Sequence, residues 1–96
     1  MTDKELLELA AKASGESTVY RGFGNSWNPL TDDGDALRLA VKFGMAIKIR
    51  HHKDVTDVLI PHRYAVGCSH GLNGGSLAAT RRAIVRAAAE IGKAMK

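Results

Sequence analysis

Cysteine, aromatic residues and long apolar runs are all scarce in this chain of 96 residues. Its single cysteine, Cys68, excludes a disulfide within the chain and so favours a reducing compartment. No stretch has the length of a membrane span, and the amino-terminal segment lacks the apolar run of a signal peptide. Two phenylalanines, two tyrosines and one tryptophan leave few rings on which nucleic-acid bases could stack. We therefore expect a cytosolic protein with no membrane partner.

The rest of the composition is that of a folded protein. Apolar residues make up 45% of the chain and charged residues 25%, which is ordinary for a globular protein and unlike a disordered one. A chain of this length buries roughly two thirds of the surface that it exposes when unfolded, which is enough for one modest core. We therefore expect a single domain over residues 1–96.

The formal net charge of +4 is concentrated in residues 76–96. This segment balances Glu90 against five basic residues, Arg81, Arg82, Arg86, Lys93 and Lys96. A solvated helix face explains such a charge, and the alternative is a nucleic-acid interface. We predict Arg81, Arg82 and Arg86 as possible partner-binding residues.

The most regular stretch is residues 27–44. Pro29 restricts Asn28 to extended geometry, and the acidic residues that follow offer side-chain oxygens to the free N–H groups of a helix start. The pattern predicts a helix over residues 33–43 that ends at Gly44.

Three clustered carboxylates, Asp32, Asp33 and Asp35, lie where negative charge complements the dipole of this helix. The alternative is a divalent-metal site. Their spacing lacks the longer loop and the terminal glutamate of a calcium motif, so we predict no metal site.

Trp27 precedes the same helix, and we expect its ring to pack under the helix as a core residue. The functional alternative is an exposed aromatic anchor, which makes Trp27 a further possible partner-binding residue. The predicted apolar stripe of the helix consists of Ala36, Leu37, Ala40, Val41 and Phe43.

The amino-terminal segment predicts a helix and then a strand. Thr2 and Glu5 have the spacing of a capping box, which predicts a helix over residues 3–14 that ends at Gly15. Residues 17–23 are rich in β-branched and aromatic residues and predict a short strand.

After Gly44 the apolar period changes from helical to two. Met45, Ile47 and Ile49 share one face of a predicted strand over residues 45–50. A polar turn at 51–54 leads to a second strand at 55–60, and the alternation of Tyr64, Val66 and Cys68 suggests a third.

The last part of the chain predicts a loop at 69–75 and a helix over residues 76–95 capped by Ser76. The apolar stripe predicted for this helix includes Leu77, Thr80, Ile84, Ala87, Ala88, Ile91 and Met95. The predicted architecture is α+β, with three helices packed on a small, mainly antiparallel sheet of three or four strands.

No catalytic, cofactor-binding or metal-binding residue is predicted. The transition-metal candidates are His51, His52, His62, Cys68 and His70. One cysteine with scattered histidines is a weak metal signal, and turn histidines with a buried thiol explain it as well. The glycine-rich residues 71–76 lack the lysine of a phosphate-binding loop, so we expect a connector there.

Three segments together resemble a family of small phage and prophage proteins described as having a phage α/β/α sandwich domain. They are residues 1–13, 27–41 and 79–92, and the residues between them do not share the resemblance. The resemblance implies an α/β/α sandwich-like fold and an accessory protein that a bacteriophage makes in the host cytoplasm. The family has no established activity, so the resemblance implies no site residues.

These observations favour a protein-interaction module that binds a host or phage protein or forms a homodimer. The alternative is a nucleic-acid-associated accessory factor that uses the basic last helix. We do not expect an enzyme, because no residue pattern predicts a reaction centre.

Overall fold

The computed structural model describes residues 2–15, 27–60 and 65–95. They form three α-helices, a three-stranded antiparallel sheet and two short 3-10 helices, so the predicted α+β class is confirmed. In chain order the elements are α1 (Asp3–Ser14), α2 (Asp33–Phe43), β1 (Ala46–Arg50), η1 (His51–Lys53), β2 (Val55–Leu59), β3 (Ala65–Ser69), η2 (Gly71–Asn73) and α3 (Ser76–Ala94). The strand predicted at 17–23 lies outside the described residues.

The ends of α1 follow the predicted local chemistry. The Thr2 hydroxyl accepts the N–H of Glu5 at 3.1 Å, and the Glu5 carboxylate accepts the N–H of Thr2 at 3.1 Å. Because this carboxylate accepts hydrogen bonds from the Thr2 backbone and side chain, the pKa of Glu5 is lowered. At the other end Gly15 is left-handed with φ of 86°, which confirms the predicted stop.

The start of α2 also uses its acidic residues as predicted. Asp32 is the N-cap and accepts the N–H of Asp35 at 2.9 Å. Asp35 is buried, accepts the N–H of Asn28 at 2.9 Å and pairs with Arg38 at 2.5 Å. Asp35 therefore fixes the turn before the helix in addition to complementing the helix dipole.

The predicted Ser76 cap of α3 is wrong. The N-cap is Gly75, which makes no side-chain capping bond, and Ser76 is the first helical residue. Gly74 and Gly75 both have positive φ, and the Gly75 N–H donates to the His70 carbonyl at 2.8 Å. The tight turn after η2 requires positive φ at the residues directly before α3. Glycine adopts this conformation readily, and the N-cap is therefore a glycine and not Ser76.

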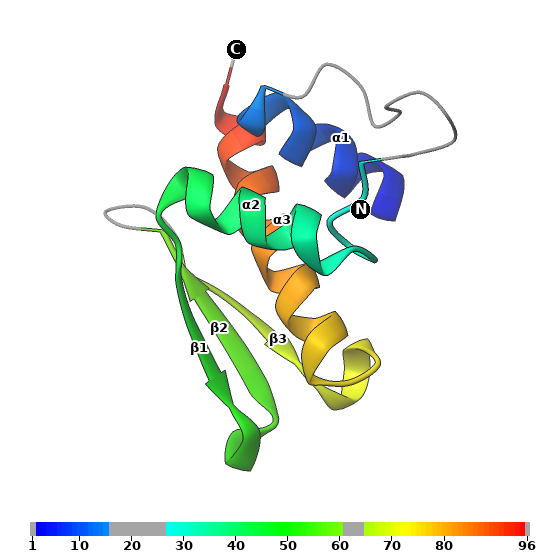
Figure 1. The fold of residues 1–96 in the computed structure, drawn as a ribbon, viewed down its shortest axis with the longest axis vertical. Coiled ribbons are helices and arrows are strands. Elements are labelled where there is room, and N and C mark those ends of the chain that lie inside the picture. Colours follow the sequence, from blue (N-terminus) through cyan, green and yellow to red (C-terminus); the bar gives the residue numbers. More distant parts are fainter. Residues whose placement is uncertain (1, 16–26, 61–64, 96) are drawn as a thin grey trace.

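The sheet has the strand order β1–β2–β3, and α3 packs on one of its faces (Figure 1). That face buries Thr56 and Val58 of β2 together with Val66 and Cys68 of β3. The alternation predicted for Val66 and Cys68 is confirmed. The opposite face includes the exposed Gly67.

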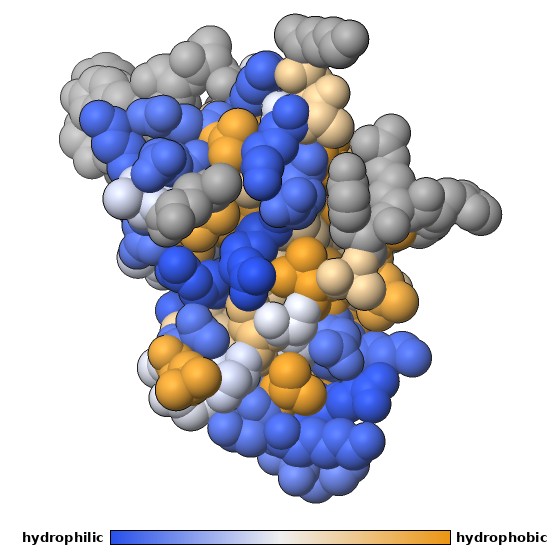
Figure 2. Space-filling model, turned by 180° about the vertical axis from the view of Figure 1, so that it is seen from behind, coloured by the Kyte–Doolittle hydropathy of each residue, from blue (hydrophilic) through white to orange (hydrophobic). Residues whose placement is uncertain are grey.

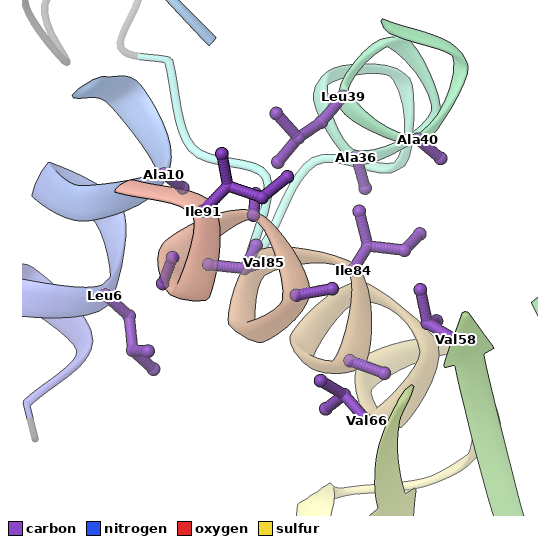
Figure 3. Close-up of a cluster of buried hydrophobic side chains, with 14 of the residues drawn as sticks. Leu6, Ala10, Ala36, Leu39, Ala40, Val58, Val66, Ile84, Val85 and Ile91 are labelled. Carbon is purple, nitrogen blue, oxygen red and sulfur yellow. The ribbon is translucent and has the colours of Figure 1, made fainter. Parts of the chain in front are cut away.

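Helix α3 is the centre of the core, with the sheet against its first half and α1 against its second half (Figure 3). Its buried residues are mostly alanines, which allow close approach by both neighbours. Helix α1 comes so close that a Cβ added at Gly92 would lie 2.1 Å from the Leu9 carbonyl oxygen.

The apolar stripe predicted for α2 is only partly buried. Ala36 and Ala40 are buried as predicted, together with Leu39, which the predicted stripe omitted. Leu37 and Val41 are 61% and 72% exposed, so their predicted place in the core is wrong. The helix is apolar over more of its circumference than its contact with the core can cover.

Candidate functional site

An apolar groove of about 490 Å³ lies where α2, β1 and the first turns of α3 meet. We call it the α2–β1 groove. Its apolar walls come from all three elements and comprise Ala36, Leu37, Ile47, Ile49, Leu77 and Ile84. Concave, mostly apolar surfaces of this size are typical of binding sites.

The groove stays open because α3 covers the sheet unevenly. Ile49 lies opposite Thr56 in the sheet, yet Ile49 is 48% exposed while Thr56 is completely buried. Strand β1 thus extends its inner face beyond the cover of α3. Leu37 and Leu77, the latter 67% exposed, rise on the other two sides of the groove.

One polar feature of the groove is an ion pair between Arg81 and Asp33, at 2.6 Å. The Arg81 Nε also donates to the Leu30 carbonyl at 2.8 Å. These contacts tie α3 to the start of α2 across 48 residues of sequence. Arg81 therefore contributes to the position of the groove wall while its charge is balanced by Asp33.

The other two predicted binding arginines also make contacts within the protein. Arg82 pairs with Asp3 of α1 at 2.8 Å. Arg86 lies 3.4 Å from both the Gly67 carbonyl oxygen and the Cys68 sulfur. The three arginines thus link α3 to α2, α1 and β3, and they do not form one unpaired basic surface.

Trp27 is 3% exposed and belongs to the buried core. This confirms the expectation that its ring packs as a core residue. Its indole is not presented to a partner in this conformation.

A buried polar chain lies under the groove. The Thr80 hydroxyl, which lines the groove, is 3.0 Å from the Thr56 hydroxyl, and the latter is 2.8 Å from the Nε2 of His70. The His70 Nδ1 lies 3.7 Å from the Asp54 carboxylate. The order of acid, imidazole and hydroxyl is that of a nucleophilic triad.

Burial gives this polar chain a structural role. Thr56 has no exposed surface and His70 is 5% exposed, so the hydroxyl next to the imidazole is closed to a substrate. The hydrogen bonds satisfy buried polar groups and join β2, the residue that precedes η2, and α3 below the groove.

The histidines and the cysteine are otherwise dispersed. The rings of His51 and His70 are 5.8 Å apart in an edge arrangement, while the Cys68 thiol is buried beside Arg86. Within residues 2–15, 27–60 and 65–95, no three His, Cys, Asp or Glu side chains are grouped to hold a metal ion. His62 lies outside these ranges. None of the helices in the described part of the chain is both long and apolar enough to cross a bilayer.

The groove was not predicted from the sequence. Its exposed wall residues Leu37, Ile49 and Leu77 were all assigned to apolar faces directed toward a core. The available signal in the sequence was the large number of apolar residues in α2. In addition to the residues that it buries, this helix has Leu37 and Val41 one turn apart.

Comparisons with protein-family models, with curated proteins and with solved structures gave no significant match to this chain. The resemblance to small phage proteins stays a prediction.

Proposed function

We propose that this chain is a protein-interaction module that binds its partner in the α2–β1 groove. The observation that carries the proposal is the convergence of Leu37, Ile49 and Leu77 on one groove while each is at least 48% exposed. Single exposed apolar residues are common on proteins, but several around one concave surface are typical of a docking site.

The groove walls stand on regular secondary structure, which favours binding over accidental exposure. Leu37 and Leu77 lie on α-helices, Ile49 lies on a strand, and the Arg81–Asp33 ion pair links the two helices. A preorganised apolar surface loses little conformational entropy when a partner docks.

Nucleic-acid binding, the alternative, has weaker support. It was based on the basic residues of α3, and Arg81, Arg82 and Arg86 have protein partners. The groove itself is apolar, whereas a phosphate backbone is bound by free cationic side chains. The resemblance of three segments to phage proteins favours a phage or host protein as the partner.

The experiment is affinity capture from a bacterial lysate followed by binding of the purified chain to each captured protein. Leu37→Glu and Leu77→Glu place a charge in the groove wall and should weaken binding at least tenfold. Val41→Glu is the matched control because Val41 is equally apolar, more exposed and on the same helix, but does not line the groove. Circular dichroism and thermal melts should be used to check that all three variants are folded before their binding is compared.

The proposal fails if every captured protein binds the groove variants as tightly as the parent, or if none binds the purified chain. Binding to duplex DNA or RNA that weakens steeply with salt and is unaffected by Leu37→Glu would favour the nucleic-acid alternative.

A further inference from the structure

Strand β1 forms one wall of the groove and is an edge of the sheet that the described residues form. An edge strand presents N–H and C=O groups on its outer side, and another extended segment can pair with them. In β1, Ile47 and Ile49 face the groove while Lys48 and Arg50 face the opposite side of the sheet. A segment added at this edge would have alternate side chains on the same two sides.

The side of β1 opposite the groove is basic. Lys48 is exposed and lies opposite Asp57 in the sheet, and Asp57 pairs with Arg50 at 3.3 Å. The two cations on this side of β1 thus face a single carboxylate of β2. Directly after β1, η1 adds the exposed Lys53, which the exposed Asp54 follows, while His51 of the same turn lines the groove. The end of the molecule with the β1–β2 connection is accordingly hydrophilic in Figure 2.

We infer that the partner docks through an extended segment that pairs with β1 and alternates apolar and acidic residues. Its apolar side chains enter the α2–β1 groove between Ile49 and Leu77, and its acidic side chains lie beside Lys48. Opposite charges on neighbouring strands are favourable, whereas like charges are destabilising. This inference rests on the proposed function and specifies the chemistry of its partner.

A second copy of the chain fits this edge less well. Antiparallel pairing of the whole of β1 with itself would place Lys48 directly opposite Lys48 of the copy. A partner helix could fill the apolar groove, but it would leave the backbone groups of β1 unpaired. Only an extended acidic segment satisfies the apolar wall, the backbone edge and the basic side together.

The test begins with a random nine-residue peptide library displayed against the full chain. We expect the enriched peptides to alternate apolar and acidic residues. The tightest peptide is then synthesised with one backbone N-methyl group at each position in turn. Methylation at alternate positions should reduce affinity at least tenfold while the positions between are tolerated, because only every second N–H of an added strand points toward β1.

Charge reversal tests the basic side independently. Lys48→Glu should weaken the acidic peptide about fivefold and strengthen a peptide with lysine at the same positions. Val41→Glu is the control and should bind both peptides as the parent does. Hydrogen exchange should show that those amides of residues 46–50 that point away from β2 become protected when the acidic peptide binds.

Four results would overturn the inference. In the peptide selection, the first is that the enriched peptides have apolar residues at helical spacing, and the second is that no peptide is enriched. The third is that hydrogen exchange finds the outward-pointing amides of β1 already protected in the free chain. The fourth is that sedimentation shows a dimer whose stability Lys48→Glu changes. If the inference fails while captured partners remain sensitive to Leu37→Glu, the docking groove stands and only the extended segment is refuted. If sensitivity to Leu37→Glu is also absent, both proposals fail.

Discussion

Replacement of Gly92 by alanine tests how closely the two longest helices approach each other. Gly92 lies in α3, where a Cβ would meet the Leu9 carbonyl oxygen at 2.1 Å and the Leu9 carbonyl carbon at 2.8 Å. Both distances are below the 3.0 Å that Cβ contacts in proteins essentially never fall under. The neighbour is the backbone of α1, so it cannot move away by a change of rotamer.

Two effects of opposite sign decide the result of Gly92→Ala. Alanine is favoured over glycine inside a helix by about 1 kcal/mol. Overpacking of a tight core costs about 1–3 kcal/mol, and a rigid backbone neighbour places this site at the upper end. The free energy of unfolding should therefore fall by about 2 kcal/mol, which lowers the melting temperature by about 8–16 °C in a domain of this size.

The assay is urea unfolding followed by circular dichroism, with thermal melts as a second measurement. Gly34→Ala is the matched control because a Cβ at Gly34 would meet only side-chain atoms, of Asp32 at 3.2 Å and Arg38 at 3.3 Å. We expect the control to be as stable as the parent or up to about 1 kcal/mol more stable, because no backbone neighbour opposes the helix preference for alanine. A Gly92→Ala variant as stable as the parent would refute the close packing of α1 on α3.

Three further substitutions test the polar contacts. Thr56→Val keeps the shape of the side chain but leaves the Nε2 of His70 without its hydrogen-bond partner. The free energy of unfolding should therefore fall by about 1–3 kcal/mol. An unchanged midpoint of urea unfolding would contradict the buried polar chain. Asp35→Asn removes a buried carboxylate that accepts a backbone N–H and should cost about 1–3 kcal/mol by the same measurement, with no loss if that contact is absent. The pKa of Glu5 should lie below the ordinary range of a glutamate in NMR titration, and it should rise in Thr2→Ala. Since the pKa is lowered in the folded state, the capping contribution to stability is present at neutral pH and is lost as the pH falls through the lowered pKa. Equal pKa values of Glu5 in the parent and the variant would argue against the capping box.

The sequence predicted those features that depend on neighbours within a few residues. The capping box of Thr2 and Glu5 and the left-handed glycines at 15 and 44 each involve one turn of chain, and all are present. The Ser76 cap failed although the residue type was suitable. The turn from His70 to Gly75 determines that Ser76 is the first helical residue and Gly75 the N-cap. The preference of serine for N-cap positions does not predict this turn.

The groove was harder to predict because it depends on where α2 lies relative to β1. A period of 3.6 residues shows that a helix has an apolar face, but it does not show whether that face meets a core or a partner. Leu39 and Leu37 are the same residue type two positions apart, yet one is 3% and the other 61% exposed. Only tertiary packing distinguishes them.

The same limit applies to charge, and it changes where a partner should be sought. The basic excess of the sequence lies in α3, which suggested a nucleic-acid surface. In the fold, Arg81 and Arg82 pair with Asp33 and Asp3, carboxylates 48 and 79 residues away along the chain. Because these pairs balance charge on α3, the exposed Lys48, on the side of β1 opposite the apolar groove, becomes a more informative contact to test for an acidic ligand. Apolar wall, strand edge and basic side chain then coincide at β1, and this coincidence makes β1 the element whose substitution is most informative about function.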